Sequence, residues 1–244
     1  MASYVLARNA FRDGGSVDAE DTLQDFGFTN AIEPSSALQV GFAAGGSRSI
    51  TYTFEAATSI DCLCLFKHNL FNQCDFVSIS YDAGTDYIEL ARITPSSSAP
   101  IMLAFANVIV DQIRITIEAP IAPIYISNIS VGLRHRISEG QYIGFQDPTY
   151  GVSHELVSNR TRSNELVGLV RQRKAVETTI EAKHLTESWV DANWPTLYEH
   201  IARYPFYLQW REDKQAAYCV AIDIAQPRFT TLNRLAFSLK VQVY

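Results

Sequence analysis

Cys62, Cys64, His68 and Cys74 are the residues whose types and spacing could do chemistry, because thiolate and imidazole groups bind zinc. The residues around Cys62 and Cys64 alternate as in a strand, which places both thiols on one face about 6.5 to 7 Å apart. Two thiolates on one tetrahedral zinc must lie within about 4 Å of each other. We therefore predict that these cysteines are buried core thiols and that the chain has no metal site here.

The four cysteines, Cys219 included, are too few in 244 residues for a disulfide scaffold, so we interpret them as free thiols.

A second cluster is acidic and consists of Asp18, Glu20, Asp21 and Asp25. Calcium prefers several carboxylate and carbonyl oxygens, so this stretch is a candidate cation site. It lacks the fixed spacing of a dedicated calcium loop. A solvated acidic surface is therefore the preferred interpretation, and calcium binding stays open.

The remaining residues give no catalytic constellation. The sequence shows no nucleophile elbow, phosphate loop, dinucleotide fingerprint or metal-binding His-Glu pair on a helix. His200 lies in an expected helix without an acidic or thiol partner at fixed spacing, which favours a surface or structural role. A glycoside hydrolase would need two carboxylates flanking the scissile bond, and the sequence cannot pair them. We predict a protein that is not an enzyme, with no catalytic, cofactor-binding or metal residues; ligand-binding residues stay unknown.

Charge and composition exclude further classes of function. Residues 1–135 carry 7 Lys+Arg and 14 Asp+Glu, or -7, while the rest of the chain carries 13 and 12, or +1. Neither part has the clustered basic surface that binding to nucleic acid requires. No apolar run approaches the roughly 18 residues of a membrane span, and the first residues do not look like a secretory signal, so we expect the chain to fold in a cytoplasm.

The chain is organised around residues 49–81, where apolar and polar residues alternate in three runs. Such a period of two predicts strands with one face toward a core. Further strands are expected at 88–93, 105–117 and 124–133, with no helical period among them. Residues 1–48 are expected to form long loops around the resulting β-sandwich.

The second half predicts a different domain. A connector over 136–151 contains three glycines. Strands are expected at 155–169 and 171–182, then a helix at about 186–204 with Thr186 as its cap and Pro195 as a possible restart. Strands at 205–210, 218–224 and 235–243 complete the α+β domain of residues 152–244. The fold class is therefore mainly β, with a sandwich over 1–135, the connector, and an α+β domain with one main helix.

The order of elements in the first half resembles galactose-binding-like jelly-roll domains of the discoidin type. The resemblance rests on a strand ending in His68-Asn69-Leu70, followed by VSISYDAG, DQIRITIE and ISNISVGL. In that family, loops at one end of the jelly roll often bind sugars or lipid head groups. The resemblance therefore implies a jelly roll with a possible glycan site.

A jelly roll followed by a connector and a β-rich domain with one helix also resembles the tail-tip and distal-tail proteins of tailed phages. This resemblance implies a non-enzymatic virion component, made in the bacterial cytoplasm, that assembles with itself in a ring and with other tail proteins. The alternative is a carbohydrate-binding module protein that recognises glycans on a cell surface. Self-association is expected through the C-terminal domain, because its last strand, 235–243, lies either inside the sheet or at an edge that must be covered.

Overall fold

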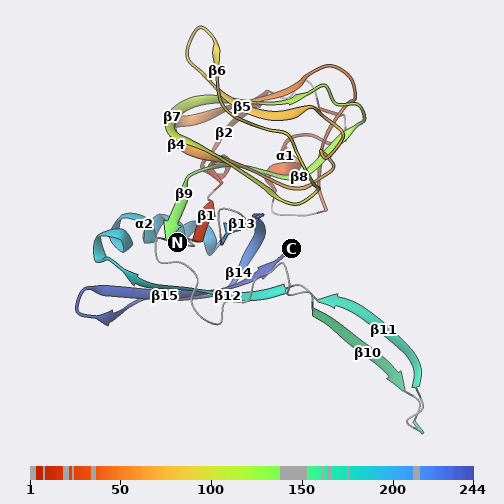
Figure 1. Ribbon diagram of the computed structural model, residues 1–244, viewed down its shortest axis with the longest axis vertical. Helices are drawn as coiled ribbons and strands as arrows, with labels where there is room; N and C mark the ends of the chain where they lie inside the picture. The colour runs from red at the N-terminus through yellow and green to blue at the C-terminus, as the bar shows by residue number, and fades with distance from the viewer. Residues whose placement is uncertain are drawn as a thin grey trace.

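Two antiparallel β-sheet structures stack along the long axis of the molecule, and a separate two-stranded hairpin projects from the lower one (Figure 1). The computed structural model describes residues 4–7, 9–18, 22–23, 25–33, 37–137, 153–160, 162–163, 166–174, 176–210 and 215–244. The predicted fold class is confirmed: the protein is mainly β, with a sandwich and an α+β part whose main helix is α2 (Glu187–Ile201).

The sandwich is a jelly roll whose strands follow the order β3-β8-β4-β7-β5-β6, with β2 added beside β4. Their bounds are β2 Gly15–Asp18, β3 Val40–Phe42, β4 Arg48–His68, β5 Phe76–Asp82, β6 Tyr87–Ile93, β7 Ile101–Glu118 and β8 Ile124–Gly132. A short 3-10 helix η1 (Ala10–Asp13) and one turn of helix α1 (Thr29–Ile32) close one side.

Strand β4 corrects the prediction of separate strands over 49–66, because it continues through both runs as 21 residues. Its first half pairs with β2 and with the end of β7, and its second half pairs with β8 and with the start of β7. Register shifts between Thr53 and Thr58 and between Ile60 and Cys62 mark the bend. A bulge lets a strand turn without ending, so β4 serves both layers of the sandwich.

The sandwich core fills the space between these layers with branched aliphatic side chains and an aromatic group at the η1 side. Phe11 packs on Tyr52 at 4.5 Å between ring centroids and on Phe28 at 5.5 Å. The fully buried members include Ile50, Ile60, Leu63, Leu65, Leu70, Val77, Ile79, Ile113, Ile124, Ile129 and Val131. Burying this much apolar surface is the main stabilising term for the sandwich.

The first strand corrects the expectation that residues 1–48 only wrap the sandwich. Strand β1 (Tyr4–Ala7) lies in the lower sheet, where it pairs with β9 (Arg134–Ile137) and β13 (Phe206–Gln209). Strand β1 has only four residues and is followed by loop-forming residues from Asp13 onward, so the sequence pattern did not predict it. Both ends of the sandwich segment therefore enter the lower sheet side by side (Figure 1).

The lower sheet has the order β12-β15-β14-β13-β1-β9, and helix α2 covers one face of it. The remaining strands are β12 Val176–Leu185, β14 Ala217–Thr231 and β15 Arg234–Val243. Strand β15 lies between β12 and β14, so the expected last strand forms but is not an edge. Of the two expected positions, inside the sheet or at an edge, the structure shows the first, so β15 gives no support for a ring of subunits, and self-association through this domain stays a prediction.

Helix α2 confirms the expected helix. Thr186 caps it by accepting a hydrogen bond from Trp189 N–H at 3.2 Å. Its apolar stripe packs on the sheet, with Trp194 4.6 Å from Phe237 between ring centroids. Pro195 lies inside one continuous helix rather than at a restart.

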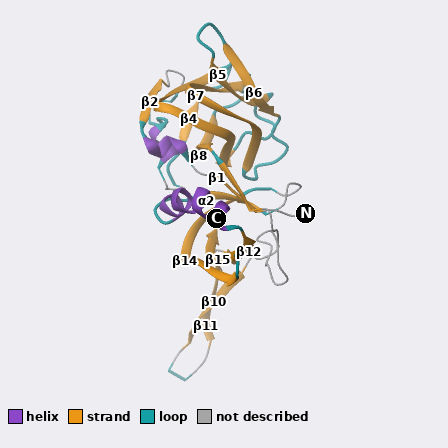
Figure 2. Ribbon diagram, turned by 90° about the vertical axis from the view of Figure 1, so that its left-hand side faces the viewer, coloured by secondary structure: helices purple, strands orange, loops and turns teal. Residues whose placement is uncertain are grey.

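The strands expected at 155–169 and 171–182 are a hairpin followed by a sheet strand. Strand β10 (Ser153–Arg160) pairs with β11 (Leu166–Lys174), and Val176 begins β12 one residue later. Arg162 and Ser163 lie in a turn after β10, where the continuous pattern had suggested one strand. The hairpin extends away from the rest of the molecule (Figures 1 and 2).

A second apolar cluster joins the sandwich to the lower sheet, and we call it the docking interface. Phe66 of β4 stacks on Tyr218 of β14 at 4.4 Å between ring centroids, and Tyr207 donates a hydrogen bond to Asn128 Oδ1 at 2.9 Å. Its members are Ala7, Cys62, Cys64, Phe66, Tyr207, Ala216 and Tyr218, with Met102 beside them. The division into 1–135, 136–151 and 152–244 stays a prediction; residues 138–152 of the connector lie outside the described residues.

We expect Phe66→Ala to lower the free energy of unfolding by about 3 kcal/mol, because it removes a ring that is 8% exposed and stacked on Tyr218. Urea unfolding followed by far-ultraviolet circular dichroism measures this change. Ile109→Ala is the matched control, since Ile109 is 72% exposed and its loss should change stability by less than about 0.5 kcal/mol. Equal effects of the two substitutions would contradict the role of the docking interface.

Candidate ligand-binding site

The thiols of Cys62 and Cys64 face the docking interface rather than the sandwich core. Both are fully buried, which confirms that they are buried thiols, and Leu63 and Leu65 between and after them point into the core. Cys62 Sγ donates to Gly132 O at 3.3 Å. Burial, followed by the hydrogen bond with Cys62, raises the pKa of the Cys64 thiol well above its usual value. These thiols therefore pack as small neutral side chains.

His68 and Cys74 do not join them in a metal site. His68 Nε2 lies 2.9 Å from Ala99 O, so this nitrogen carries the proton and donates it to the carbonyl. Burial lowers the pKa of His68, which keeps the ring neutral. Among the described residues, no group of three or more His, Cys, Asp or Glu side chains could hold a metal ion.

Two of the four residues of the acidic stretch lie in the described part of the chain. Asp18 ends β2 with an exposed side chain, and Asp25 is exposed in the following turn. Glu20 and Asp21 lie outside the described residues. Calcium binding at this stretch therefore stays a hypothesis.

Of the two roles expected for His200, surface or structural, its surroundings fit the structural one. It is 6% exposed, and its Nε2 accepts the backbone N–H of Asn9 at 3.4 Å. The contact ties the end of α2 to the residue that caps η1. It joins the lower domain to the sandwich and leaves this nitrogen with a structural task.

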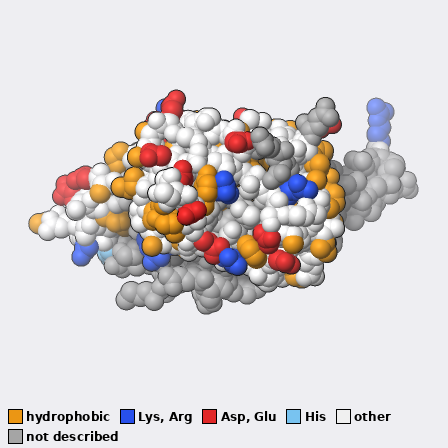
Figure 3. All heavy atoms as spheres, turned by 90° about the horizontal axis from the view of Figure 1, so that it is seen from above, with side chains coloured by type: hydrophobic (Ala, Val, Ile, Leu, Met, Phe, Trp, Pro, Cys, Tyr) orange, Lys and Arg blue, Asp and Glu red, His pale blue; other side chains and the backbone are white. Residues whose placement is uncertain are grey.

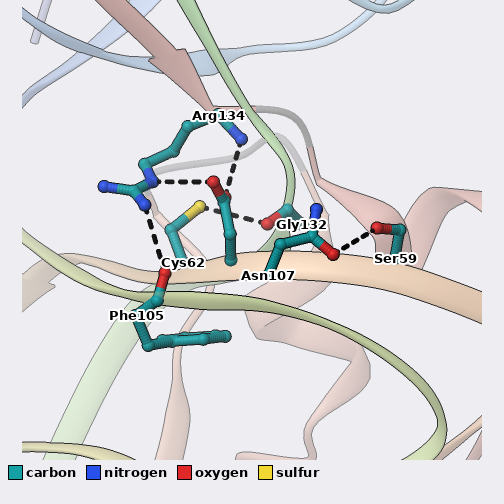
Figure 4. A network of polar contacts seen from close by, with 7 residues as sticks. Ser59, Cys62, Phe105, Asn107, Gly132 and Arg134 are labelled. Carbon is teal, nitrogen blue, oxygen red and sulfur yellow. Dashed lines mark hydrogen bonds and ion pairs between the residues drawn. The ribbon is translucent and has the colours of Figure 1, made fainter.

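An ion pair clamps the junction where the chain leaves the sandwich (Figure 4). Arg134 Nε lies 3.0 Å from Asp61 Oδ2, and the Arg134 backbone N–H donates to Asp61 Oδ1 at 2.8 Å. A third bond runs from the guanidinium to Phe105 O at 3.2 Å. Both side chains are less than 15% exposed, so this carboxylate is a structural acceptor and not a free acid or base.

Three loops meet at one end of the sandwich, and we call this end the loop face. They are residues 43–47, 69–75 and 119–123. Backbone bonds join them, from Gly45 N–H to Pro120 O at 2.7 Å and from Ile121 N–H to Gln73 O at 2.8 Å. The side chain of Asn69 adds a two-way clip, since it donates to Pro123 O at 3.0 Å and accepts from Tyr125 N–H at 2.7 Å. The loops are therefore held as one surface.

The loop face presents apolar side chains on a partly strained backbone. Phe71 is 43% exposed and Ile121 is 75% exposed. Asn72 and Ala119 have positive φ values of 55° and 46°. Asparagine tolerates this left-handed region, whereas alanine rarely adopts it, so the backbone at Ala119 is strained. Glu118 accepts from Ser47 Oγ at 2.6 Å nearby. An apolar surface beside fixed amide and carboxylate groups can hold a ligand with both apolar and hydroxyl faces.

Among the described residues, hollows also lie at the boundary between the domains, and two of the larger ones are lined by both domains. One, of about 250 Å³, is lined by the 94–100 loop and by Gln209 and Gln215. The other, of about 180 Å³, lies between η1 and the end of α2 and is lined by Arg12, Asp13, Thr196, Glu199, His200, Arg203 and Tyr204. Glu199 and Arg203 form an exposed ion pair at 3.4 Å there. No aromatic side chain lines the first hollow, and in the second the Arg12 guanidinium lies over the Tyr204 ring, 5.1 Å from its centroid.

Sequence reasoning missed Phe71 and Ile121 because nothing in the sequence shows which loops meet. Phe71 lies in a short polar break and Ile121 in a short proline-containing break between apolar runs, where a large apolar side chain has no strand face to bury it. That mismatch was the available signal.

No protein-family model matches the sequence, and no curated protein matches it. Solved structures show a limited similarity. A CBM32 module from Clostridium perfringens, in complex with GalNAc-β-1,3-galactose, has a TM-score of 0.44 and 11% identity over 52% of this chain and 99% of that chain. A chitosan-binding module from a Paenibacillus chitosanase/glucanase has a TM-score of 0.42 and 14% identity over 48% of this chain and 93% of that chain.

A Ruminococcus gnavus GH29 fucosidase in complex with fucose has a TM-score of 0.44 and 18% identity over 52% of this chain. The match spans only 27% of the fucosidase. All three TM-scores are below 0.5, and nothing in the comparisons points to a phage tail protein. Similarity at this level does not carry a ligand or an activity over to this chain.

The described residues contain no helix long and apolar enough to cross a membrane.

We expect Cys74 to react first with a thiol reagent, because Cys62, Cys64 and Cys219 are buried and Cys74 is only partly buried. Burial raises the pKa of the Cys74 thiol to about 11, so its labelling rate should rise about tenfold for each pH unit between 7 and 10. Mass spectrometry of the labelled native protein measures the order. Labelling of Cys62 or Cys64 before Cys74 would show that the docking interface opens readily.

Tyr218 should make the fold sensitive to alkali. Burial raises the pKa of its hydroxyl from about 10 to about 12, so the neutral form is stabilised by folding. This contribution is present below about pH 10 and is lost as the pH rises through 12, amounting to about 2 to 3 kcal/mol. Between pH 9 and pH 12, the free energy of unfolding measured with urea should fall less steeply for Tyr218→Phe than for the unmodified protein. If the free energies of both proteins fall in parallel with pH, the effect is excluded.

Proposed function

We propose that the protein is a non-enzymatic glycan-binding protein whose site is the loop face of the sandwich. The observation that carries the proposal is the exposure of Phe71 and Ile121 on loops locked by backbone bonds. A sugar ring offers an apolar C–H face and a rim of hydroxyls. The phenyl ring of Phe71 can pack under the first, while fixed amide and carboxylate groups can bond to the second.

Rigidity supports this assignment. A weak ligand gains most from a surface that loses little conformational entropy on binding. The clip through Asn69 and the bonds of Gly45 and Ile121 hold the loops before any ligand arrives. The strained backbone at Ala119 persists because the neighbouring bonds fix it, which is a frequent property of binding loops.

The absence of catalysis is part of the proposal. Three mostly buried ionisable groups have structural partners. Asp61 pairs with Arg134, His68 bonds to Ala99, and His200 bonds to Asn9. Each would have to give up a buried hydrogen bond in order to transfer a proton.

The second candidate is a structural role in a multisubunit assembly such as a phage tail. The β10–β11 hairpin favours it, because in the described part of the chain its two strands pair only with each other. A two-stranded hairpin alone is only marginally stable in water, so such an arm fits a protein that meets neighbours.

We expect Phe71→Ala to weaken glycan binding at least tenfold, because it removes the ring that a sugar would cover. A glycan array that includes galactose, N-acetylgalactosamine, fucose and chitosan oligosaccharides should identify a ligand, and titration calorimetry measures the loss. Ile109→Ala is the matched control, with an exposed apolar side chain outside the loop face. If no glycan binds, or if both variants bind equally, the loop face is not a glycan site and the assembly role becomes the better function.

A further inference from the structure

In the described part of the chain, strands β10 and β11 pair with each other and with no other strand. This hairpin is a two-stranded sheet at one end of the long axis, opposite the sandwich, in both side views (Figures 1 and 2). Its sequence is rich in branched aliphatic residues: Leu156, Val157, Leu166, Val167, Leu169 and Val170. Such residues favour strands that are packed on at least one face. The composition of the hairpin is therefore typical of strands that add to another sheet.

Charge indicates which partner. Residues 153–174 carry 5 Lys+Arg and 2 Asp+Glu, or +3, so the rest of the chain carries 15 and 24, or -9. A basic arm on an otherwise acidic chain is attracted to a second copy of the same chain. It is repelled by the other projecting element, the tip of the β14–β15 hairpin, which carries Arg228 and Arg234.

Strand β6 has the complementary properties. It is the outermost strand of the sandwich sheet, paired on one side with β5, and Ile88 on it is 47% exposed. The turn before it holds Asp82 and Asp86, both exposed. Figure 3 looks down on this end of the molecule and shows acidic side chains among apolar ones. An outer strand offers unpaired backbone groups that an added strand can bond.

We propose that the β10–β11 hairpin of one copy adds to the β6 edge of a second copy. The donor and acceptor surfaces lie at opposite ends of one chain, so the contact is head-to-tail. Each copy uses both surfaces, and the repeated contact gives a closed ring or a filament. This inference rests on the second candidate function, assembly, and does not depend on glycan binding.

Cysteine cross-linking of the full chain tests the contact. In a Cys74→Ser background, Val157→Cys on the arm and Ile88→Cys on β6 are mixed under mild oxidation. We expect a disulfide-linked dimer from the mixture, and a ladder of oligomers when one chain carries both. The matched control uses Leu232→Cys in place of Ile88→Cys, because Leu232 lies at the β14–β15 tip and is 95% exposed. Cross-linking to Leu232→Cys instead, or to neither position, overturns the proposal.

Charge reversal gives an independent measurement. Arg171→Glu with Arg173→Glu should weaken self-association, measured by sedimentation velocity, roughly tenfold. Adding Asp82→Lys and Asp86→Lys to the same chain should restore self-association. Added salt should weaken the self-association of the unmodified protein. Arg228→Glu is the control and should leave association unchanged. A chain that stays monomeric at every concentration, or a pair of reversals that does not rescue, overturns the proposal, whereas a failed glycan array leaves it unaffected.

Discussion

The second half of β4 is buried on both faces, and the arrangement of the two domains depends on this constraint. Leu63 and Leu65 lie in the sandwich core, while Cys62, Cys64 and Phe66 lie in the docking interface. A strand with apolar residues on both faces requires a layer on each side. The sandwich supplies one layer, and Tyr207 and Tyr218 of the lower sheet supply the other. The small thiols allow the two sheets to approach, and the aromatic rings fill the space around them.

Polar contacts at the edge of this interface fix how the domains sit. Asp61 and Arg134 hold the chain where β8 passes into β9, Tyr207 bonds to Asn128, and His200 bonds to the backbone of Asn9. Such bonds add little net stability but are costly to break once buried, so they select one orientation. The consequence for function is that the loop face of the sandwich keeps a fixed position relative to the lower sheet.

Much of the fold could be predicted from the sequence because it depends on local alternation. The strands at 88–93, 124–133 and 235–243 and the helix with its Thr186 cap follow from periodicity and capping alone. The errors share one cause. Whether residues 55–58 end a strand or bend it, and whether 4–7 join a distant sheet, depend on neighbours that alternation does not record. For the same reason the sequence leaves open whether 235–243 lie inside the sheet or at its edge. The buried thiols were predicted, but the second layer that buries them was not. Phe71 and Ile121 lie on loops that a backbone bond joins, and such a contact has no pattern in sequence.

Strand β1 has a consequence for how the chain folds during synthesis. Leu6 is paired with Leu208, so about 200 residues separate the two partners. The lower sheet cannot close until β13 has left the ribosome, although β1 is among the first residues made. The sandwich can collapse earlier, because its strands all lie between Gly15 and Gly132. Until β13 and β14 arrive, Cys62, Cys64 and Phe66 face water on the nascent sandwich. The exposed aromatic and thiol surface of that intermediate is where chaperones would bind and where premature association between nascent chains would begin.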